Sequence, residues 1–169
     1  MRVKPVPAAV DELRAPEETK AYLRDHGLPR HAPLDFEFVF PEGRVPTLAE
    51  ALGVPEAPAL RRYRKLGQDA ECHVCLDEGQ AGAVYLVSVN PRIPTLFMNS
   101  SVPQMAACLE AAGAVIEELH RSKEGVASGA RQAAHGSRLR EALGAIDARA
   151  VASDTVWDAI VDQVRTGML

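Results

Sequence analysis

The stretch of residues 96–105 constrains the fold of this chain more than any other. Its apolar start, Leu96–Met98, is typical of the end of a strand, and residues 99–101 then offer three capping side chains in a row. Ser101 and Gln104 have the spacing of a capping box, in which each side chain satisfies the other's free backbone N–H. Pro103 falls in the first helical turn, where its missing N–H costs nothing. The sequence therefore predicts a strand that turns directly into a helix.

The helix that follows has one apolar face. Apolar side chains recur with helical spacing over four turns, at Met105, Cys108, Leu109, Ala112, Ile116 and Leu119. A periodic apolar stripe of this kind has to be buried against another element. The junction thus joins a strand and a long helix that share one core.

The residues before the junction predict a small antiparallel sheet. Strong alternation at Leu34–Phe40, with Leu34, Phe36, Phe38 and Phe40 on one side, indicates a strand. Further strands are predicted at 60–67, 72–77, 83–89 and 95–98, separated by short turns. Because short connections join antiparallel neighbours, these strands predict a twisted meander with helices packed against it, an α+β fold.

The remaining segments complete a single domain over residues 1–169. Prolines at 5, 7 and 16 predict an extended lead-in over residues 1–16. A helix is expected from Glu17 to a Gly27 terminator, and Thr47 with Glu50 forms a second capping box. The small, polar composition of 120–138 is typical either of a mobile linker or of a poorly packed helix. A short helix should carry Leu139, Leu143 and Ile146 on one face, and Ser153–Asp154 should cap a last helix, with Trp157, Ile160, Val161 and Val164 inside and Gly167 at its end.

Composition and charge limit the class of protein. The net charge of −4 over 169 residues gives no general attraction to nucleic acid or to an anionic membrane surface. The sequence contains no continuous apolar stretch of about 18 residues, which is the length that a helix needs to span a bilayer. Three cysteines argue against a disulfide framework, and residues 1–7 lack the apolar core of a secretory signal, so we expect a cytoplasmic protein.

Cys72 and Cys75 are the most obvious candidates for chemistry, because thiolates two residues apart suit zinc or a redox pair. However, no second ligand pair accompanies them, and a regular strand points these two positions to opposite faces. The five histidines are scattered, Ser100 and Ser101 lack a nucleophile elbow, and the acids near 69–78 suit turns. The sequence therefore predicts no catalytic residue, no metal site and no cofactor.

Four blocks of this sequence resemble the SUKH-4 family of bacterial immunity proteins, within the SMI1/KNR4-like superfamily. They are Tyr63–Asp69, Val74–Asp77, Val84–Val87 and Phe97–Met105, and further support comes from Tyr22–Pro29, Asp147, Ala150, Trp157, Ile160 and Gly167–Leu169. The matching motif positions are Gly67, Asp69, Cys75, Asp77, Asn99, Ser100, Ser101, Gln104 and Trp157. The chain departs from the family pattern at Ala70–Glu71, where glycines usually follow the aspartate.

The resemblance implies an SMI1/KNR4-like α+β fold and a non-enzymatic role. Such a protein binds and neutralises a cognate polymorphic toxin, often a nuclease or a nucleic-acid deaminase, in the cell that produces it. Occlusion of a basic active site by a concave sheet face with an acidic rim would be the physical mechanism.

Two alternatives remain open at this stage. The same fold could serve as a regulatory or scaffold module that binds another protein, or Cys72 and Cys75 could form a thiol or metal-dependent enzyme. From polarity alone, the partner-binding residues are predicted to be Arg61, Arg62, Arg64, Asp69, Glu71 and Glu78. The partner is expected to be a protein toxin, with neither nucleic acid nor membrane contacted directly.

Overall fold

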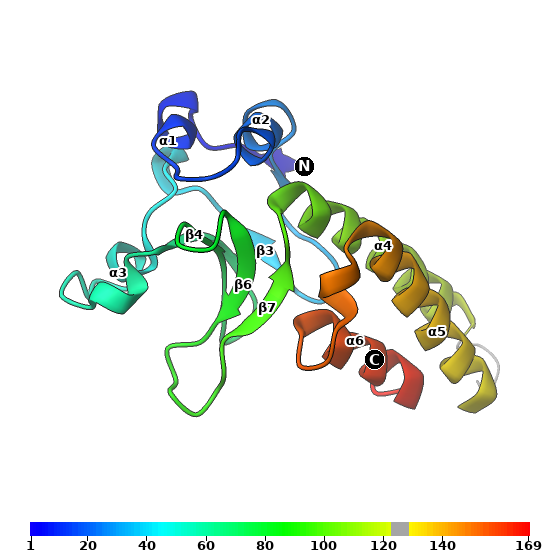
Figure 1. Cartoon of the computed structure of the whole chain (residues 1–169). Coiled ribbons are helices and arrows are strands. Elements are labelled where there is room, and N and C mark those ends of the chain that lie inside the picture. The colour runs from blue at the N-terminus through cyan, green and yellow to red at the C-terminus, as the bar shows by residue number, and fades with distance from the viewer. Residues whose placement is uncertain (123–128) are drawn as a thin grey trace.

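The structure is a computed structural model that describes residues 1–122 and 129–169. Its centre is a five-stranded antiparallel sheet in which each strand pairs with the next along the chain (Figure 1). The strands are β3 (Glu37–Phe38), β4 (Tyr63–Gln68), β5 (His73–Asp77), β6 (Ala83–Val87) and β7 (Leu96–Asn99). The predicted meander and the α+β class are confirmed.

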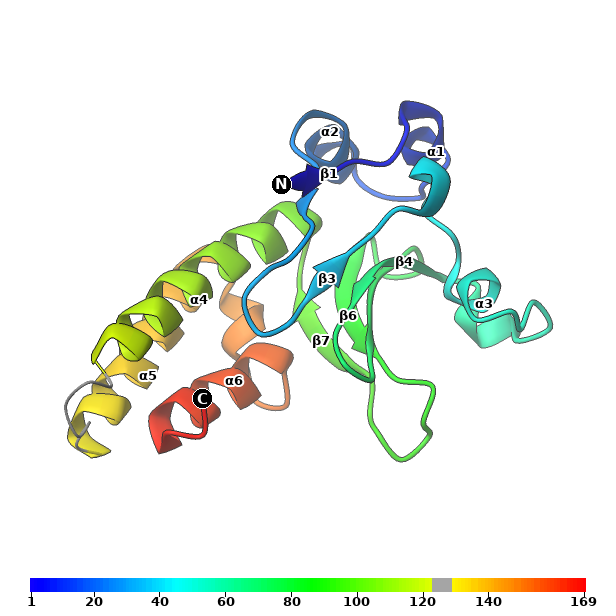
Figure 2. The same ribbon diagram turned by 180° about the vertical axis from the view of Figure 1, so that it is seen from behind.

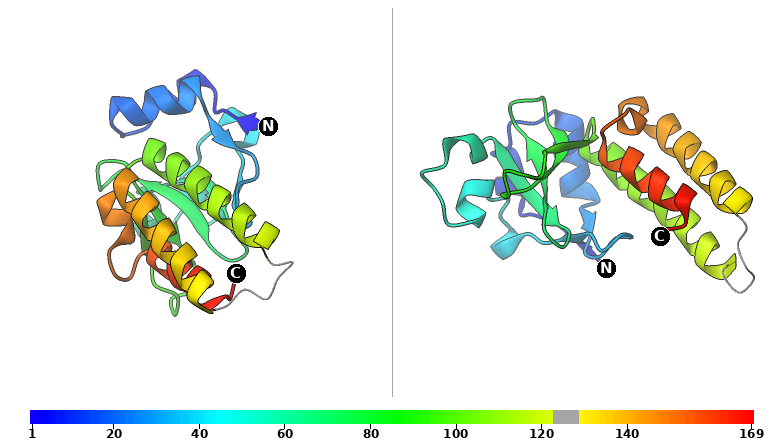
Figure 3. Two further views of the ribbon diagram at one scale, coloured as in Figure 1. Left: turned by 90° about the vertical axis from the view of Figure 1, so that its right-hand side faces the viewer. Right: turned by 90° about the horizontal axis from the view of Figure 1, so that it is seen from below.

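The two faces of the sheet pack against different neighbours. Alternate residues such as Val74, Leu76 and Met98 face the main core, which contains the buried stripe of the long helix α4 (Val102–Ser122). The intervening residues Cys75 and Val87 face a smaller cluster around α3 (Leu48–Ala51). Figure 3 shows the long helices on one side of the sheet and α3 on the other.

The C-terminal half forms a helical layer around α4. The helix α5 (Gly129–Ile146) packs on α4 and on α6 (Val156–Thr166), and the short 3-10 helix η3 (Ala148–Val151) connects α5 to α6. Trp157, Ile160, Val161 and Val164 are buried, and Gly167 ends α6 with φ of 74°, both as predicted. Among the described residues, the structure has no helix with the length and apolarity that a membrane crossing requires.

The junction has the predicted strand-to-helix geometry. Met98 and Met105 are fully buried, and Ser101 Oγ accepts a hydrogen bond from the Gln104 backbone N–H at 3.4 Å. The side chain of Gln104 has other partners than the capping box implies: its oxygen accepts from Ser101 Oγ at 2.9 Å, and its nitrogen donates to the carbonyl of Ile146 at 3.1 Å. The start of α4 is therefore tied to the end of α5.

The N-terminal residues were expected to be extended, and that prediction is wrong for part of them. Pro7–Asp11 form the helix α1, which begins with a proline at its first position and buries Val10. Before it, β1 (Arg2–Val3) pairs with β2 (Leu28–Pro29), which follows the predicted helix α2 (Glu17–Asp25). Figure 2 shows these elements above the central sheet. Tertiary packing of Val10 decides this segment, which has too few residues to be stable as a helix alone.

Several other predicted boundaries differ from the structure. The strand predicted at 60–67 begins only at Tyr63, because Pro58–Leu60 form a 3-10 helix. Leu34 and Asp35 have φ of 66° and 58° inside a tight reversal, closed by the Ala32 N–H on the Phe36 carbonyl at 2.8 Å, so only Glu37–Phe38 form a strand. The cap of α6 is Thr155, whose Oγ1 accepts from the Asp158 N–H at 3.1 Å, and not Ser153–Asp154. Within the predicted linker 120–138, residues 120–122 belong to α4 and 129–138 to α5, while 123–128 lie outside the described residues.

The remaining short helices precede β4 in the chain. The capping box of α3 is confirmed, because Thr47 Oγ1 accepts from the Glu50 N–H at 3.2 Å and Glu50 accepts from the Thr47 N–H at 2.8 Å. The 3-10 helices η1 (Pro41–Gly43) and η2 (Pro58–Leu60) lie on either side of it in the chain. Together they place α3 against the second face of the sheet.

Candidate partner-binding face

A buried polar network joins the strand-to-helix junction to the C-terminal helices. Asp147 is 4% exposed, and its Oδ2 accepts from the Ser100 N–H at 2.6 Å and from Asn99 Nδ2 at 3.3 Å. Its Oδ1 accepts from Ser100 Oγ at 3.0 Å and from the Arg149 N–H at 3.2 Å. Asn99 Oδ1 in turn accepts from Trp157 Nε1 at 2.8 Å. The network therefore connects β7, η3 and α6 through side chains that water barely reaches.

This network gives a structural role to the most specific motif residues. Asn99, Ser100 and Trp157 use their polar atoms on one another or on Asp147, and Ser101 and Gln104 close the start of α4. Buried polar groups cost free energy unless each finds a partner, so side chains that satisfy one another specify a single packing of these elements.

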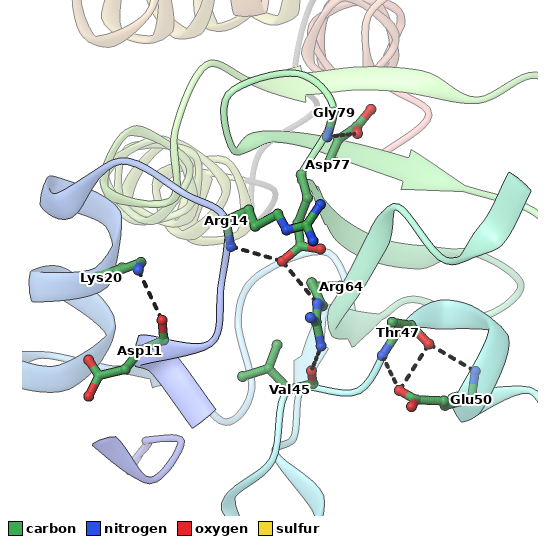
Figure 4. A network of polar contacts seen from close by, with 10 residues as sticks. Asp11, Arg14, Lys20, Val45, Thr47, Glu50, Arg64, Asp77 and Gly79 are labelled. Atoms are coloured by element: carbon green, nitrogen blue, oxygen red, sulfur yellow. Dashed lines mark hydrogen bonds and ion pairs between the residues drawn. The ribbon is translucent and has the colours of Figure 1, made fainter. Parts of the chain in front are cut away.

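A second polar cluster lies where β4 begins and β5 ends. Asp77 is fully buried, accepts two hydrogen bonds from the Arg62 guanidinium, and accepts from the Gly79 N–H at 2.8 Å. Next to it, Glu78 pairs with Arg64 Nε at 3.0 Å and accepts from the Arg14 N–H at 2.9 Å (Figure 4). This cluster attaches the N-terminal segment to the β5–β6 hairpin, and it raises the pKa of Arg62 through the Asp77 hydrogen bond.

The residues predicted to bind the partner do not form one site. Arg62, Arg64 and Glu78 lie together in the cluster just described, and Arg61 lies beside them with its guanidinium on the Pro55 carbonyl at 3.0 Å. Asp69 and Glu71 lie at the opposite end of the β4–β5 hairpin, about five residues or ~17 Å along the strand. The two groups would contact different parts of a partner.

The loop at 69–72 explains the departure at Ala70–Glu71. Asp69 Oδ1 accepts from the Cys72 N–H at 2.9 Å, and the Asp69 N–H donates to the Cys72 carbonyl at 3.0 Å. Neither Ala70 nor Glu71 is among the residues with positive φ, so this turn does not need a glycine at either position. Gly67 does need to be glycine, since a Cβ there would lie 2.4 Å from the Glu37 carbonyl oxygen.

The cysteines have the properties of buried apolar side chains. Burial raises the pKa of Cys75 to about 12 and that of Cys108 to about 11, and it also raises the pKa of the partly exposed Cys72. Within residues 1–122 and 129–169, no group of three histidine, cysteine or acidic side chains could hold a metal ion. Thiols with raised pKa values are poor nucleophiles and poor metal ligands at neutral pH.

Half-buried aromatic rings gather on the face of the sheet that is turned away from α4. Cross-strand pairing places Lys65, Cys75, Tyr85 and Phe97 in one row over four strands, because residues directly opposite one another share a face. The rings of Tyr85 and Phe97 meet edge to face with centroids 5.6 Å apart. Tyr63 lies on the same face, two positions before Lys65.

An arginine lies over the ring at each end of this group. Arg62 Cζ is 5.2 Å from the centroid of Tyr63, and Arg149 Cζ is 4.5 Å from the centroid of Phe97. We call the five residues Arg62, Tyr63, Tyr85, Phe97 and Arg149 the aromatic face. Tyrosine, phenylalanine and arginine are enriched at protein interfaces, and tyrosine and arginine are also enriched among the residues that dominate binding energy.

Sequence reasoning missed most of the aromatic face. Of its members only Arg62 was predicted to bind a partner. Alternation could have placed Tyr63 and Tyr85 on strand faces, but only the register of β6 and β7 shows that Tyr85 and Phe97 are neighbours. Arg149 reaches the face from η3, and no spacing in the sequence indicates that contact.

A pocket of about 370 Å³ adjoins the same side of the sheet, between α3 and β3–β4. Its walls include Glu37, Val39, Glu50 and Lys65, and Val39 is 42% exposed. Lys65 belongs both to this pocket and to the row that contains Tyr85. The second side of the sheet is therefore hollowed beside the aromatic face, a shape that can receive side chains of a partner.

Fold and surface together define a class: a small α+β protein whose polar motif residues stabilise its own packing and which presents an aromatic sheet face. A comparison with protein-family models then gives the family. The model described as "SUKH-4 immunity protein" matches residues 3–163, and the chain belongs to this family of immunity proteins. Comparisons with curated proteins and with solved structures give no match.

Proposed function

We propose that this protein neutralises its cognate toxin by binding it and covering its active site, without catalysing a reaction. Membership of the SUKH-4 immunity family supports a toxin as the partner. The observation that carries the binding mode is the aromatic face, where Tyr63, Tyr85 and Phe97 remain half-exposed beside two arginines.

The energetics favour this face as the main contact. Covering the exposed part of a tyrosine or phenylalanine ring removes apolar area from water at about 25 cal/mol per Å². Because these rings are held by strands, little side-chain entropy is lost on binding. A preformed sheet surface of this kind suits tight association with one partner.

The toxin is proposed to be a nuclease or a nucleic-acid deaminase. Such enzymes attract nucleic acid with basic surfaces, and a chain with a net charge of −4 is attracted to the same surfaces at long range. Occlusion would then exclude the nucleic-acid substrate. Exposed acidic residues outside the aromatic face, such as Glu71 among the residues predicted from polarity, would contribute to this steering.

The test is calorimetric titration of this protein with a catalytically inactive variant of the toxin encoded beside it. Tyr85→Ala and Phe97→Ala should each weaken binding by about 10- to 100-fold, the range of interface hot spots. Tyr22→Ala is the matched control. Tyr22 is also half-buried, and its ring centroid lies 5.9 Å from Cζ of an arginine, Arg2, but it belongs to α2. It should change affinity by less than about threefold.

Each result has a distinct meaning. If the unaltered protein does not bind the toxin and does not restore growth of cells that express it, the proposed function is wrong. If it binds but the face variants bind equally well, the aromatic face is wrong as the contact. Capture of a non-toxin protein through Tyr85 and Phe97 would instead favour the regulatory or scaffold module.

A further inference from the structure

The charged side chains that lie over the rings of the aromatic face differ in sign from the net charge of the chain. Lys65 donates to the neutral Gln68 amide oxygen at 2.9 Å, and Arg61 donates to the neutral carbonyl of Pro55. Asp77 on this face is paired with Arg62, and the carboxylates of Glu37 and Glu50 lie with Lys65 around the adjoining pocket. The charged groups that lie directly over the rings, Arg62 and Arg149, are therefore both cations in a chain of net charge −4.

Arg149 is the most available cation of the group. Its side chain is exposed, its guanidinium lies over Phe97, and none of the ion pairs between described residues includes it. Arginines elsewhere do have carboxylate partners, for example Arg140 with Asp158 and Arg138 with Glu118. Among residues 1–122 and 129–169, the guanidinium N–H groups of Arg149 therefore have no ion-pair partner, while a ring shields one side of the guanidinium.

The backbone at Arg149 is held firmly. Its N–H donates to Asp147 Oδ1, which itself accepts from Ser100, so the start of η3 is attached to the buried network. Asp147 contacts the backbone N–H of Arg149 and not its guanidinium. A stacked, preorganised guanidinium loses little freedom when it forms two parallel hydrogen bonds to a carboxylate.

We infer that Arg149 is an anchor for a carboxylate of the bound protein, so that the partner surface over Phe97 is acidic. This inference rests on the proposed function and assigns the chemistry of one contact within it. An acidic patch of the toxin meets the arginine locally, while the negative charge of the rest of the chain acts at longer range. The aromatic rings then exclude water from the pair and strengthen it.

The experiment measures binding of the inactive toxin to three variants. Arg149→Glu should weaken binding by about 30-fold or more, and Arg149→Lys should weaken it clearly because lysine keeps the charge but loses the planar fork. Arg2→Glu is the control, since Arg2 also lies over a tyrosine and is exposed but belongs to the N-terminal elements. Changing the contacted acidic residue of the toxin to lysine should restore the affinity of the Arg149→Glu variant.

Two results would overturn the inference. Arg149→Glu could bind within about threefold of the unaltered protein while Tyr85→Ala still weakens binding, which would remove the anchor but keep the proposed function. Alternatively, a fluorescein-labelled single-stranded oligouridylate could bind the free protein and lose that binding in Arg149→Glu. Arginine beside aromatic rings would then be a nucleic-acid site. Absence of toxin binding by the unaltered protein would refute the proposed function instead.

Discussion

Replacing Asp147 tests whether the buried network stabilises the fold. The carboxylate accepts hydrogen bonds from two backbone N–H groups, those of Ser100 and Arg149, and from the side chains of Ser100 and Asn99. In Asp147→Ala, the Ser100 hydroxyl can rotate and Asn99 Nδ2 keeps a contact with Cys108 Sγ at 3.3 Å, but the two backbone donors cannot turn away. Both donors are partly buried, and a donor that loses its partner away from water costs about 1–3 kcal/mol, so the variant should lose about 2–4 kcal/mol of unfolding free energy.

Asp147→Asn separates charge from shape at the same position. One amide oxygen can replace Oδ2 and keep the Ser100 N–H bond, and the new NH₂ can donate to the Ser100 hydroxyl. The Arg149 N–H then faces a donor, so the expected loss is smaller, about 1–3 kcal/mol. The unfolding free energy should therefore be lowest for Asp147→Ala, intermediate for Asp147→Asn and highest for the unaltered protein.

Urea unfolding followed by tryptophan fluorescence measures these free energies at the site itself. Trp157 is the single tryptophan, is fully buried, and donates to Asn99 inside the network. Asp162→Ala is the control, because it removes a carboxylate that forms an exposed ion pair with Arg165 on α6, and it should cost less than about 1 kcal/mol. A loss below about 1 kcal/mol for Asp147→Ala would refute the argument that this network holds the helical layer.

Two further perturbations follow from local geometry. Gly67→Ala should destabilise the fold by about 1–3 kcal/mol, since its Cβ would meet the Glu37 carbonyl oxygen and the Phe38 ring. The control Gly129→Ala should be neutral or stabilising, because there is open space around Gly129. Equal urea unfolding midpoints for the two variants would contradict this prediction. Burial raises the pKa of Cys75 to about 12, so the folded state holds its proton where the unfolded chain releases it. The stability from this thiol is complete below about pH 9 and is lost between about pH 9 and 12. The melting temperature of Cys75→Val should therefore fall less steeply above about pH 9 than that of the unaltered protein. An equally steep fall in both proteins would contradict the role given to the Cys75 thiol.

Local and periodic signals predicted much of the fold. The capping spacing at Thr47–Glu50 and the terminators Gly27 and Gly167 appear in the structure as the sequence predicted. The apolar stripe of α4 is confirmed except at Ile116, which is half-buried while its neighbour Val115 is buried. Each of these depends on residues within a few positions of one another, where backbone geometry and side-chain chemistry suffice. The meander follows in the same way from short turns between alternating strands.

Local sequence also misled at particular places. The alternation that begins at Leu34 continues across a reversal in which Leu34 and Asp35 adopt positive φ, and a pattern of polarity carries no sign of φ. Thr155 was overlooked as a cap because Ser153 and Asp154 precede it and have the same capping chemistry. Pro7–Asp11 became a helix because Val10 is buried by residues far away in the chain.

What the sequence by itself determined are the strands, the long helices with most of their ends, and the family motif that these elements carry. Only the tertiary structure decided what the motif residues do. Asn99 and Asp147 are 48 positions apart, and their hydrogen bond fixes the helical layer to the end of β7. It also decided the candidate site, because strand register brings Tyr85 to Phe97, and the path of η3 brings Arg149 over that ring. The physical reason is that such contacts depend on how elements pack, and packing is specified by the whole core at once.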